Sequence, residues 1–430
     1  MKRECTQRTD KTSKHGLDRR SFLKRLSAAA VVYGTGSRTK LRLARLQGQP
    51  DKKTHVAVIG AGAFGGWTAL YLLRAGTRVT LVDEWGPGNS RASSGGETRI
   101  IRATYGPTQP YTKIVARALQ LWVENERRWN MQLYNRTGVL WLPAQDDQFE
   151  RGSLTMLREA GLNFEELSSM ELAKRYPQIN FEGVKWAIHE TNAGYLTARR
   201  ACEAVLAGFI AEGGRYQQLA VREPRASGGE VHQVTLSDGS QLSADAYVFA
   251  CGPWLGKLFP DVIGDLITPT RQEVFFFGTA AGDSRFSEEQ LPAWIDHGIP
   301  PFYGIPNNQW RGFKIANDTR GPVFDPTTGE RTPTPEGIKE ARKYIAFRFP
   351  LLKDAPLLES RVCQYENSPD HNLIIDRHPR AGNLWLVGGG SGHGFKQGPA
   401  VGEMVANLVV NQGTPLDVFK LARFSKVAAR

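Results

Sequence analysis

Three glycines near the start of the chain have the spacing of a nucleotide-binding turn. Gly60, Gly62 and Gly65 form a Gly-x-Gly-x-x-Gly pattern, and an acidic residue, Asp83, follows 18 positions after the third glycine. In such a pattern the first glycine permits a tight turn, the second lets the backbone approach a pyrophosphate, and the third allows a helix to pack closely on a strand. The acid can accept hydrogen bonds from a ribose. The pattern predicts a dinucleotide site, but alone it does not distinguish FAD from NAD.

The elements around this motif must hold it at the end of a sheet. Residues 54–59 are largely apolar and predict a strand that runs directly into Gly60. Apolar residues at helical spacing follow as far as Leu73, and residues 78–82 predict a second strand that ends next to Asp83. This order predicts a βαβ unit. The N-terminus of its helix would direct backbone N–H groups toward the phosphates.

A second segment that could do chemistry follows the acid. Residues 93–105 are rich in glycine and contain two arginines three positions apart, Arg99 and Arg102. Taken alone, the segment is typical of a surface loop with solvated charges. Its sequence, however, resembles the monomeric sarcosine oxidase family of FAD-dependent amine oxidases, part of the group that contains glycine oxidase and D-amino acid oxidase. Members carry Ser-x-x-Gly-Asp-Thr-Arg-Ile-Ile-Arg here, and this chain has Glu97 in place of the aspartate.

Two segments in the C-terminal part of the chain are similar to the same family. Residues 361–365 read Arg-Val-Cys-Gln-Tyr, and residues 391–396 read Ser-Gly-His-Gly-Phe-Lys after a predicted strand at 384–387. Glycines between a strand and a helix can bring backbone N–H groups against the N1–C2=O edge of a flavin, which carries negative charge when reduced. A glycine-rich turn that serves only tight packing is the alternative interpretation.

The resemblance implies roles for individual residues. It implies that Cys363 forms a thioether to the 8α carbon of FAD, although a lone cysteine is more often a small buried hydrophobe. It also implies that Arg102 and Lys396 hold the carboxylate of the substrate, since an anion fits between two cations. The other residues that it places at the flavin or the reacting centre are Ser93, Thr98, Arg99, Gly392, His393 and Gly394.

A lysine in the middle of the chain has a further role by resemblance. In the family, a lysine at the position of Lys314 promotes the reaction of the reduced flavin with O₂, and a fixed cation would stabilise the negative charge that develops there. The alternative is a solvated lysine on a strand. Tyr303 resembles the family's substrate-site tyrosine. The family often has a histidine four positions after the lysine, whereas this chain has Asp318, which could favour a cationic or hydroxylated substrate.

The order of predicted elements favours an α/β fold with a Rossmann-type FAD-binding domain and a discontinuous mixed-sheet substrate domain. Within it, residues 195–209 predict a helix. We expect the active site between the two domains. The predicted boundaries give the FAD-binding domain residues 51–120, 195–267 and 361–430, and the substrate domain residues 121–194 and 268–360.

The basic charge of the chain is concentrated in its first 50 residues. They contain 13 Lys and Arg against 3 Asp and Glu, whereas the remainder is nearly balanced, so a nucleic-acid partner is not expected. Arg19 and Arg20, followed by Ser-Phe-Leu-Lys and a weakly apolar stretch, are typical of a twin-arginine export signal. This predicts export through the twin-arginine machinery to the periplasm or beyond. A disordered basic tail is the alternative.

Other function classes lack support in the sequence. No stretch has the roughly 18 consecutive apolar residues of a membrane-spanning helix, so we expect no integral membrane span. The four cysteines show no Cys-x-x-Cys spacing and no histidine cluster, so we expect no metal site.

The resemblance implies an FAD-dependent oxidase of secondary or N-methylated amino acids. The amine would be oxidised to an imine that hydrolyses, and O₂ would be reduced to H₂O₂. One alternative is an exported FAD-dependent dehydrogenase that passes electrons to a quinone or a carrier. A second is a flavin-binding protein without turnover.

Overall fold

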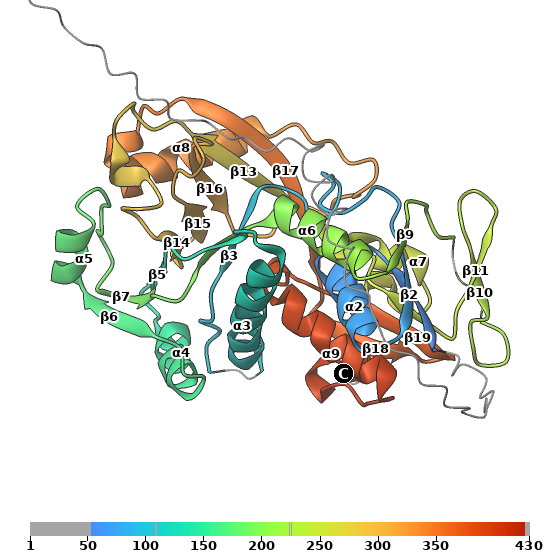
Figure 1. The fold of residues 1–430 in the computed structure, drawn as a ribbon. Helices are drawn as coiled ribbons and strands as arrows, with labels where there is room; N and C mark the ends of the chain where they lie inside the picture. Colours follow the sequence, from blue (N-terminus) through green and yellow to red (C-terminus); the bar gives the residue numbers. More distant parts are fainter. Residues whose placement is uncertain (1–52, 108–109, 223, 225, 426–430) are drawn as a thin grey trace, which may run out of the picture. The chain divides into compact units, whose positions relative to one another are not determined.

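The computed structural model describes residues 53–107, 110–222, 224 and 226–425 (Figure 1). The predicted export signal therefore lies outside the described residues. From Lys53 onward the chain forms one compact unit. In the described part of the chain, the helices are all too short or too polar to cross a membrane.

A six-stranded sheet carries the nucleotide-binding motif. Its order is β18-β19-β12-β1-β2-β9, and all neighbouring strands are parallel except β18 and β19. The apolar strands are buried in the middle of the sheet, as expected for a parallel sheet covered on both faces. The strands are β1 (His55–Ile59), β2 (Arg78–Val82), β9 (Arg215–Gln217), β12 (Ala246–Phe249), β18 (Ile374–His378) and β19 (Ala381–Gly388).

Helix α2 (Ala63–Arg74) connects β1 to β2, which confirms the predicted βαβ unit. It packs against α9 (Gly398–Val410) and α6 (Ala198–Ala211). The contact with α9 is close: a Cβ at Gly402 would lie 2.6 Å from backbone and side-chain carbons of Trp67. Helix α9, which follows the C-terminal glycine segment, is therefore held against α2, which follows the N-terminal glycine turn.

An eight-stranded mixed sheet forms the second large layer. Its order is β17-β13-β16-β15-β14-β5-β7-β6, with one parallel pair, β14 and β5. Aromatic side chains such as Trp294, Phe313 and Phe349 fill the core between this sheet and its helices. The strands are β5 (Val139–Leu142), β6 (Phe164–Ser168), β7 (Trp186–Glu190), β13 (Thr268–Phe277), β14 (Ala293–Asp296), β15 (Phe302–Ile305), β16 (Phe313–Asn317) and β17 (Leu357–Asn367).

Smaller elements complete the unit. The short strands are β3 (Thr98–Ile101), β4 (Tyr134–Asn135), β8 (Gly194–Thr197), β10 (Gln233–Thr235) and β11 (Gln241–Ser243). The other α-helices are α3 (Tyr111–Trp129), α4 (Gln148–Glu159), α5 (Ser169–Arg175), α7 (Leu255–Leu258), α8 (Pro335–Arg348) and α10 (Ala422–Ser425). The 3₁₀ helices are η1 (Gly252–Trp254), η2 (Gly264–Leu266), η3 (Ser284–Phe286), η4 (Pro350–Leu352), η5 (Phe395–Gln397) and η6 (Asp417–Phe419).

The two large sheets alternate along the chain, so each is assembled from separate segments (Figure 1). The boundary that we predicted between residues 360 and 361 falls inside β17, which pairs along its length with β13. The other domain boundaries remain a prediction. The helix predicted for residues 195–209 is wrong at its start, because β8 pairs with β3 through Thr197 and the helix begins at Ala198.

Candidate active site

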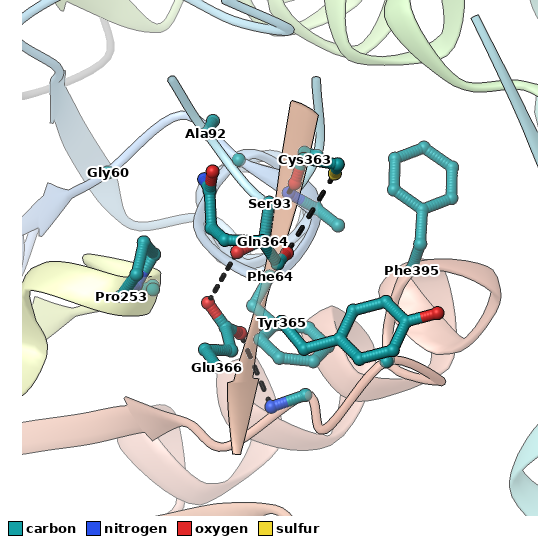
Figure 2. A pocket seen from close by; sticks show the side chains of 18 of the residues that line it. Gly60, Phe64, Ala92, Ser93, Pro253, Cys363, Gln364, Tyr365, Glu366 and Phe395 are labelled. Atoms are coloured by element: carbon teal, nitrogen blue, oxygen red, sulfur yellow. Dashed lines mark hydrogen bonds between the residues drawn. The ribbon is translucent and has the colours of Figure 1, made fainter. Parts of the chain in front are cut away.

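A cavity of about 470 Å³ lies at the ends of β1, β2 and β12, and residues of β17 also line it. Figure 2 shows Cys363, Gln364, Tyr365 and Glu366 of this strand at the cavity. Its walls include the loop after β1, the segment from Ala92 to Arg102, strand β17 and the glycine segment after β19. Of the fifteen residues that we predicted to bind cofactor or substrate, all line this cavity except Gly65, Thr98 and Lys314. These three are described below.

The first glycines shape the nucleotide end of the cavity. Gly60 has a φ of +104°, and a Cβ there would lie 2.4 Å from the carbonyl oxygen of Ala250. Gly65 does not line the cavity, but a Cβ there would lie 1.8 Å from the carbonyl oxygen of Gly60. It therefore allows α2 to approach the turn. Near Gly62 the cavity wall is formed by Ser94, whose Oγ accepts a hydrogen bond from the backbone N–H of Ala63 at 2.9 Å.

Asp83 closes the same end of the cavity. Its Oδ2 accepts a hydrogen bond from the Ala61 N–H at 2.7 Å, and its Oδ1 accepts bonds from the N–H groups of Trp85 and Gly86. Burial raises the pKa of this carboxyl group, and these three bonds oppose the rise. The side chain thus stabilises the turn and also lines the space where a nucleotide ribose would lie.

Arg99 connects the arginine segment to β17. Its Nη2 donates to the carbonyl oxygen of Ser93 at 2.9 Å and lies 3.5 Å from the Sγ of Cys363. Cys363 therefore lies in the wall of the cavity in contact with a cation. Burial raises the pKa of the Cys202 thiol to about 12 and raises that of Cys251 still further. All three cysteines are free thiols.

Lys314 and Thr98 lie together behind the main cavity. The Lys314 side chain is buried, and its Nζ donates to the carbonyl oxygen of Thr98 at 2.9 Å and to its Oγ1 at 3.2 Å. Lys314 lines a second cavity of about 380 Å³, which shares Arg99 and Cys363 with the first. Burial, aided by the charge of Arg99, lowers the pKa of Lys314 to about 7.

Two cations flank one aromatic ring at the other end of the main cavity. The guanidinium of Arg102 lies 4.0 Å from the centroid of the Tyr105 ring and donates to the carbonyl oxygen of Thr104. The Nζ of Lys396 lies 5.5 Å from the same centroid and donates to the carbonyl oxygen of His393 at 2.7 Å. Burial and the nearby Arg102 hold the pKa of Lys396 well below its usual value. A bound anion that contacts both groups would neutralise positive charge that is shielded from water.

The imidazole ring of His393 lines the same end of the cavity as Arg102 and Lys396. Its Nε2 lies 3.0 Å from the carbonyl oxygen of His371, and its Nδ1 lies 3.0 Å from the Nε2 of Gln397. Because the carbonyl accepts and the amide donates, the ring carries its proton on Nε2. Burial and the charge of Lys396 lower the pKa of His393 to about 3. Its ring is therefore neutral at neutral pH.

Two tyrosines and a carboxylate face these cations. The hydroxyl of Tyr365 donates to the Oδ1 of Asp318 at 2.6 Å, and Tyr303 is hydrogen-bonded to Tyr365. Burial raises the pKa of Tyr303 to about 12 and that of Tyr365 further, so both phenols remain protonated. All three residues line the main cavity.

Glu366 is a cavity residue that sequence reasoning missed. Its Oε1 accepts a hydrogen bond from the Gly390 N–H at 3.3 Å, and its Oε2 accepts one from the Ser93 Oγ at 3.2 Å (Figure 2). Burial raises the pKa of this carboxyl group to about 7. The sequence offers one signal, because Glu366 directly follows the Arg-Val-Cys-Gln-Tyr segment that resembles the family.

The cavity fits a dinucleotide cofactor that carries a flat ring system. Glycine turns from two different segments face it, and a Cβ at Gly392 or Gly394 would lie within 2.8 Å of an aromatic ring that bounds it. No group of three or more His, Cys, Asp or Glu in the described residues is placed to hold a metal ion. Residues 55–408 match the model of the family described as FAD dependent oxidoreductase (DAO). The chain belongs to this family.

Curated relatives of this FAD dependent oxidoreductase cover nearly all of its described length. It is 30% identical to monomeric sarcosine oxidase of Arthrobacter sp. (strain TE1826) over 379 residues, which is 85% of this chain and 95% of that one. It is 29% identical over 388 residues to N-methyl-L-tryptophan oxidase of Salmonella dublin, covering 87% of this chain and 100% of the relative. The predicted resemblance to the sarcosine oxidase family is confirmed.

The fold is confirmed by solved structures. L-Proline dehydrogenase from P. horikoshii superimposes with a TM-score of 0.78 at 21% identity, over 87% of this chain and 99% of that one. The FAD dependent oxidoreductase therefore has the predicted α/β architecture. The dinucleotide motif indicates that Gly60, Gly62 and Asp83 would hold the nucleotide part of FAD. The segments around Arg99 and Gly392 line the same cavity and would hold the flavin part.

Proposed function

We propose that this FAD-dependent oxidoreductase oxidises the C–N bond of a secondary or N-methylated amino acid and uses O₂ as the electron acceptor. The observation that carries the proposal is a pair of basic side chains, half-buried Arg102 and buried Lys396, at the opposite end of the cavity from the dinucleotide motif. A carboxylate held there would present its amine toward the middle of the cavity. The sarcosine oxidase and N-methyl-L-tryptophan oxidase relatives act on molecules of this class by name.

The protein's own residues would bind the substrate and exclude water. Arg102 and Lys396 would hold the carboxylate, and both basic groups lie close to the ring of Tyr105. When bound, FAD supplies the two-electron acceptor. The amine would lose two electrons and two protons to become an imine, water would hydrolyse the imine, and O₂ would take up two electrons and two protons to give H₂O₂.

A covalent link between Cys363 and FAD is part of this proposal. Cys363 lines the cavity beside Arg99, and Cys251 lines the same cavity without a cation in hydrogen-bonding contact. We expect acid precipitation to leave yellow flavin in the pellet of the wild-type protein and of Cys251→Ala. The Cys363→Ala variant should release its FAD into the supernatant. A yellow Cys363→Ala pellet would contradict the assignment.

Export is also part of the proposal, and it rests on the leader sequence. Arg19 and Arg20 precede a weakly apolar stretch, and the twin-arginine route carries proteins already folded with their cofactors. Covalent FAD would suit such a protein, because free FAD for rebinding is scarce outside the cell. Cell fractionation of the wild type and of a variant with both arginines changed to lysine tests this proposal.

An FAD-dependent dehydrogenase is the second candidate function. It is favoured by the position of Lys314, whose ammonium group is held by Thr98 and lines the second cavity instead of the first. A solved structure with this fold is a dehydrogenase of L-proline. Such an enzyme would reduce its FAD with the substrate but would pass the electrons to a quinone or a carrier.

One experiment separates these functions. The purified protein is mixed without oxygen with a panel of secondary and N-methyl amino acids, and the flavin absorbance is followed before and after air is admitted. Bleaching followed by rapid recovery of colour and formation of H₂O₂ supports the oxidase. Bleaching without recovery supports the dehydrogenase. If no amine bleaches the flavin, the protein binds FAD without this turnover.

A further inference from the structure

Asp318 is a carboxylate at the substrate end of the cavity. It is the first residue after β16, and its backbone N–H donates to the carbonyl oxygen of Pro301 at 2.9 Å, which holds the start of the loop. Its side chain lines the cavity, and the Tyr365 hydroxyl donates to its Oδ1 at 2.6 Å. The carboxylate therefore lies within the same walls as Arg102 and Lys396.

Charged and titratable groups face Asp318 from several elements. Tyr365 comes from β17 and Tyr303 from β15, and neither phenol ionises at neutral pH. The basic residues that interact electrostatically with Asp318 are Arg102 after β3, Lys396 in η5, His297 after β14 and Arg320 in its own loop.

We propose that Asp318 is the general base that takes a proton from the substrate ammonium group inside the cavity. This inference rests on the proposed function and adds to it a residue that touches the reacting nitrogen. Amino acids are present at neutral pH mainly as ammonium carboxylates, whereas oxidation of the C–N bond needs the nitrogen lone pair. A base close to the bound amine removes this obstacle.

The proton and electron balance of the step is simple. An N–H bond of the ammonium group breaks, an O–H bond forms on Asp318, and the electron pair stays on nitrogen. When bound, FAD would accept the electron pair of the substrate C–H bond, and the nitrogen lone pair would form the C=N bond. Asp318 returns its proton to solvent after the product leaves.

Other lining groups are poorly placed for this role. His393 donates through Nε2 to a carbonyl oxygen, and its Nδ1 is occupied by Gln397. Glu366 and Asp83 are carboxylates, but each accepts backbone N–H bonds next to the glycine turns at the cofactor end. Asp318 instead lies beside the two cations that would hold the substrate carboxylate.

The electrostatics suit a base that must accept and then release a proton. The side chain of Asp318 is exposed at the edge of the cavity, and desolvation by the surrounding walls still raises the pKa of its carboxyl group. The hydrogen bond from Tyr365 and the charges of Arg102 and Lys396 oppose this rise. The carboxylate is thus more basic than it would be in water.

The first test is the pH dependence of flavin reduction under anaerobic conditions. For Asp318→Asn we expect the second-order rate constant of reduction to be lower than wild type by about 100-fold at pH 7, because only the rare neutral amine reacts. The deficit should shrink about tenfold for each pH unit as the free amine becomes more abundant. Asp354→Asn, a change at a highly exposed aspartate, is the matched control and should follow the wild type.

A second variant tests the same role without removing the base. Tyr365→Phe deletes the hydroxyl that stabilises the Asp318 carboxylate. The acidic limb of the reduction profile should therefore move to higher pH, whereas a purely structural effect would lower the rate equally at every pH. This variant retains the aromatic ring and its packing.

A binding measurement tests the position of Asp318 without turnover. N,N,N-trimethylglycine and 3,3-dimethylbutyrate have the same shape and the same carboxylate, but only the first has a positive nitrogen, and its lack of a lone pair prevents oxidation. Titration of the flavin spectrum gives both Kd values. The wild type should bind the cationic ligand more tightly than the neutral one. In Asp318→Asn the ratio of the two Kd values should shrink by about tenfold or more.

The outcomes distinguish this inference from the proposed function. If amino acids reduce the wild-type flavin but Asp318→Asn has a parallel pH profile and an unchanged ligand preference, the role of Asp318 is overturned and the oxidation stands. If no amine reduces the wild-type flavin, both are overturned. A pH-dependent deficit together with a lost preference supports the base.

Discussion

At the scale of single residues, the site combines buried charges with neighbours that change their ionisation. Lys314 is the clearest case, because its ammonium group is buried against Thr98 and its pKa falls to about 7. A lysine with a lowered pKa is protonated only below that value. Its charge, and any effect of that charge on oxygen, is therefore present at acidic pH and lost as the pH rises through about 7.

This leads to a prediction for oxygen reactivity. If Lys314 promotes the reaction with O₂, the reoxidation rate of the reduced protein should fall as pH rises through about 7. Lys314→Met should slow reoxidation by about 100-fold or more, and its rate should no longer change in this pH range. Stopped-flow mixing with oxygenated buffer measures both. Lys353→Met, at an exposed lysine, is the control; an unchanged rate in Lys314→Met would remove the proposed role.

The residues also show where sequence reasoning reached its limit. Gly60, Gly62 and Asp83, which were selected by their spacing, and Cys363, which was selected by resemblance, all line one cavity. Each of these motifs is a contiguous segment with one backbone shape. Sequence reasoning could not show that Thr98 and Lys314 bond to each other, since they come from β3 and β16. It also missed Glu366, whose role depends on contacts with two distant loops.

At the scale of elements, the secondary-structure prediction succeeded for the unit of β1, α2 and β2, whose members are neighbours in the sequence. Strand β2 has the predicted bounds, and the helix between β1 and β2 lies where the apolar spacing put it. It failed at residues 195–197, which have a helical pattern but form β8. Pairing with β3, which is distant in sequence, overrides the local preference there.

The close packing of α2 on the glycine turn is open to a direct test. A Cβ at Gly65 would collide with the Gly60 carbonyl, which cannot move without distorting the turn. We expect Gly65→Ala to reduce the free energy of unfolding by about 1–3 kcal/mol and to weaken FAD binding. Gly66→Ala is the matched control, because its tightest contact would be with a side-chain methyl of Val205 at 3.3 Å, and the backbone of Ala61 would lie at an ordinary 3.6 Å. Equal thermal stability of the two variants would contradict this account.

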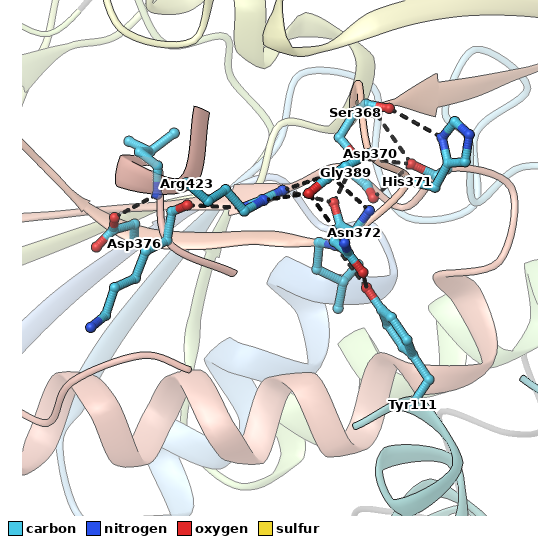
Figure 3. A network of polar contacts seen from close by, with 12 residues as sticks. Tyr111, Ser368, Asp370, His371, Asn372, Asp376, Gly389 and Arg423 are labelled. Carbon is cyan, nitrogen blue, oxygen red and sulfur yellow. Dashed lines mark hydrogen bonds and ion pairs between the residues drawn. The ribbon is translucent and has the colours of Figure 1, made fainter. Parts of the chain in front are cut away.

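At the scale of the whole molecule, the C-terminal segment is tied to the wall of the substrate end. Arg423 donates from Nε to Asp370 at 2.8 Å and from Nη2 to the carbonyl oxygen of Asn372 (Figure 3). Tyr111 from α3 bonds to the same loop through Asn372. The loop also carries His371, whose carbonyl oxygen accepts from His393 in the cavity. The end of the chain thus supports a residue of the active site.

Replacing Arg423 should therefore affect both stability and ligand binding. Its side chain is largely buried, so Arg423→Ala should lower the free energy of unfolding by about 1.5–3 kcal/mol and weaken the binding of 3,3-dimethylbutyrate. Arg380→Ala removes an exposed ion pair with Asp261 and should cost less than about 0.5 kcal/mol. Thermal unfolding and flavin titration measure these effects. If Arg423→Ala loses stability but binds the ligand as tightly as the wild type, the C-terminal segment does not support the ligand site.

Strand β17 belongs to the eight-stranded sheet and also supplies Cys363, Tyr365 and Glu366 to the cavity. Its pairing with β13 sets Cys363 opposite Gln272 and Tyr365 opposite Thr270. Because side chains alternate along a strand, the insertion of one residue before Cys363 would exchange its two faces. Cofactor attachment and substrate contacts would be lost together. Insertions and deletions can therefore be tolerated in the loops on either side of β17. Within the strand, only changes that keep the alternation of its two faces preserve the site.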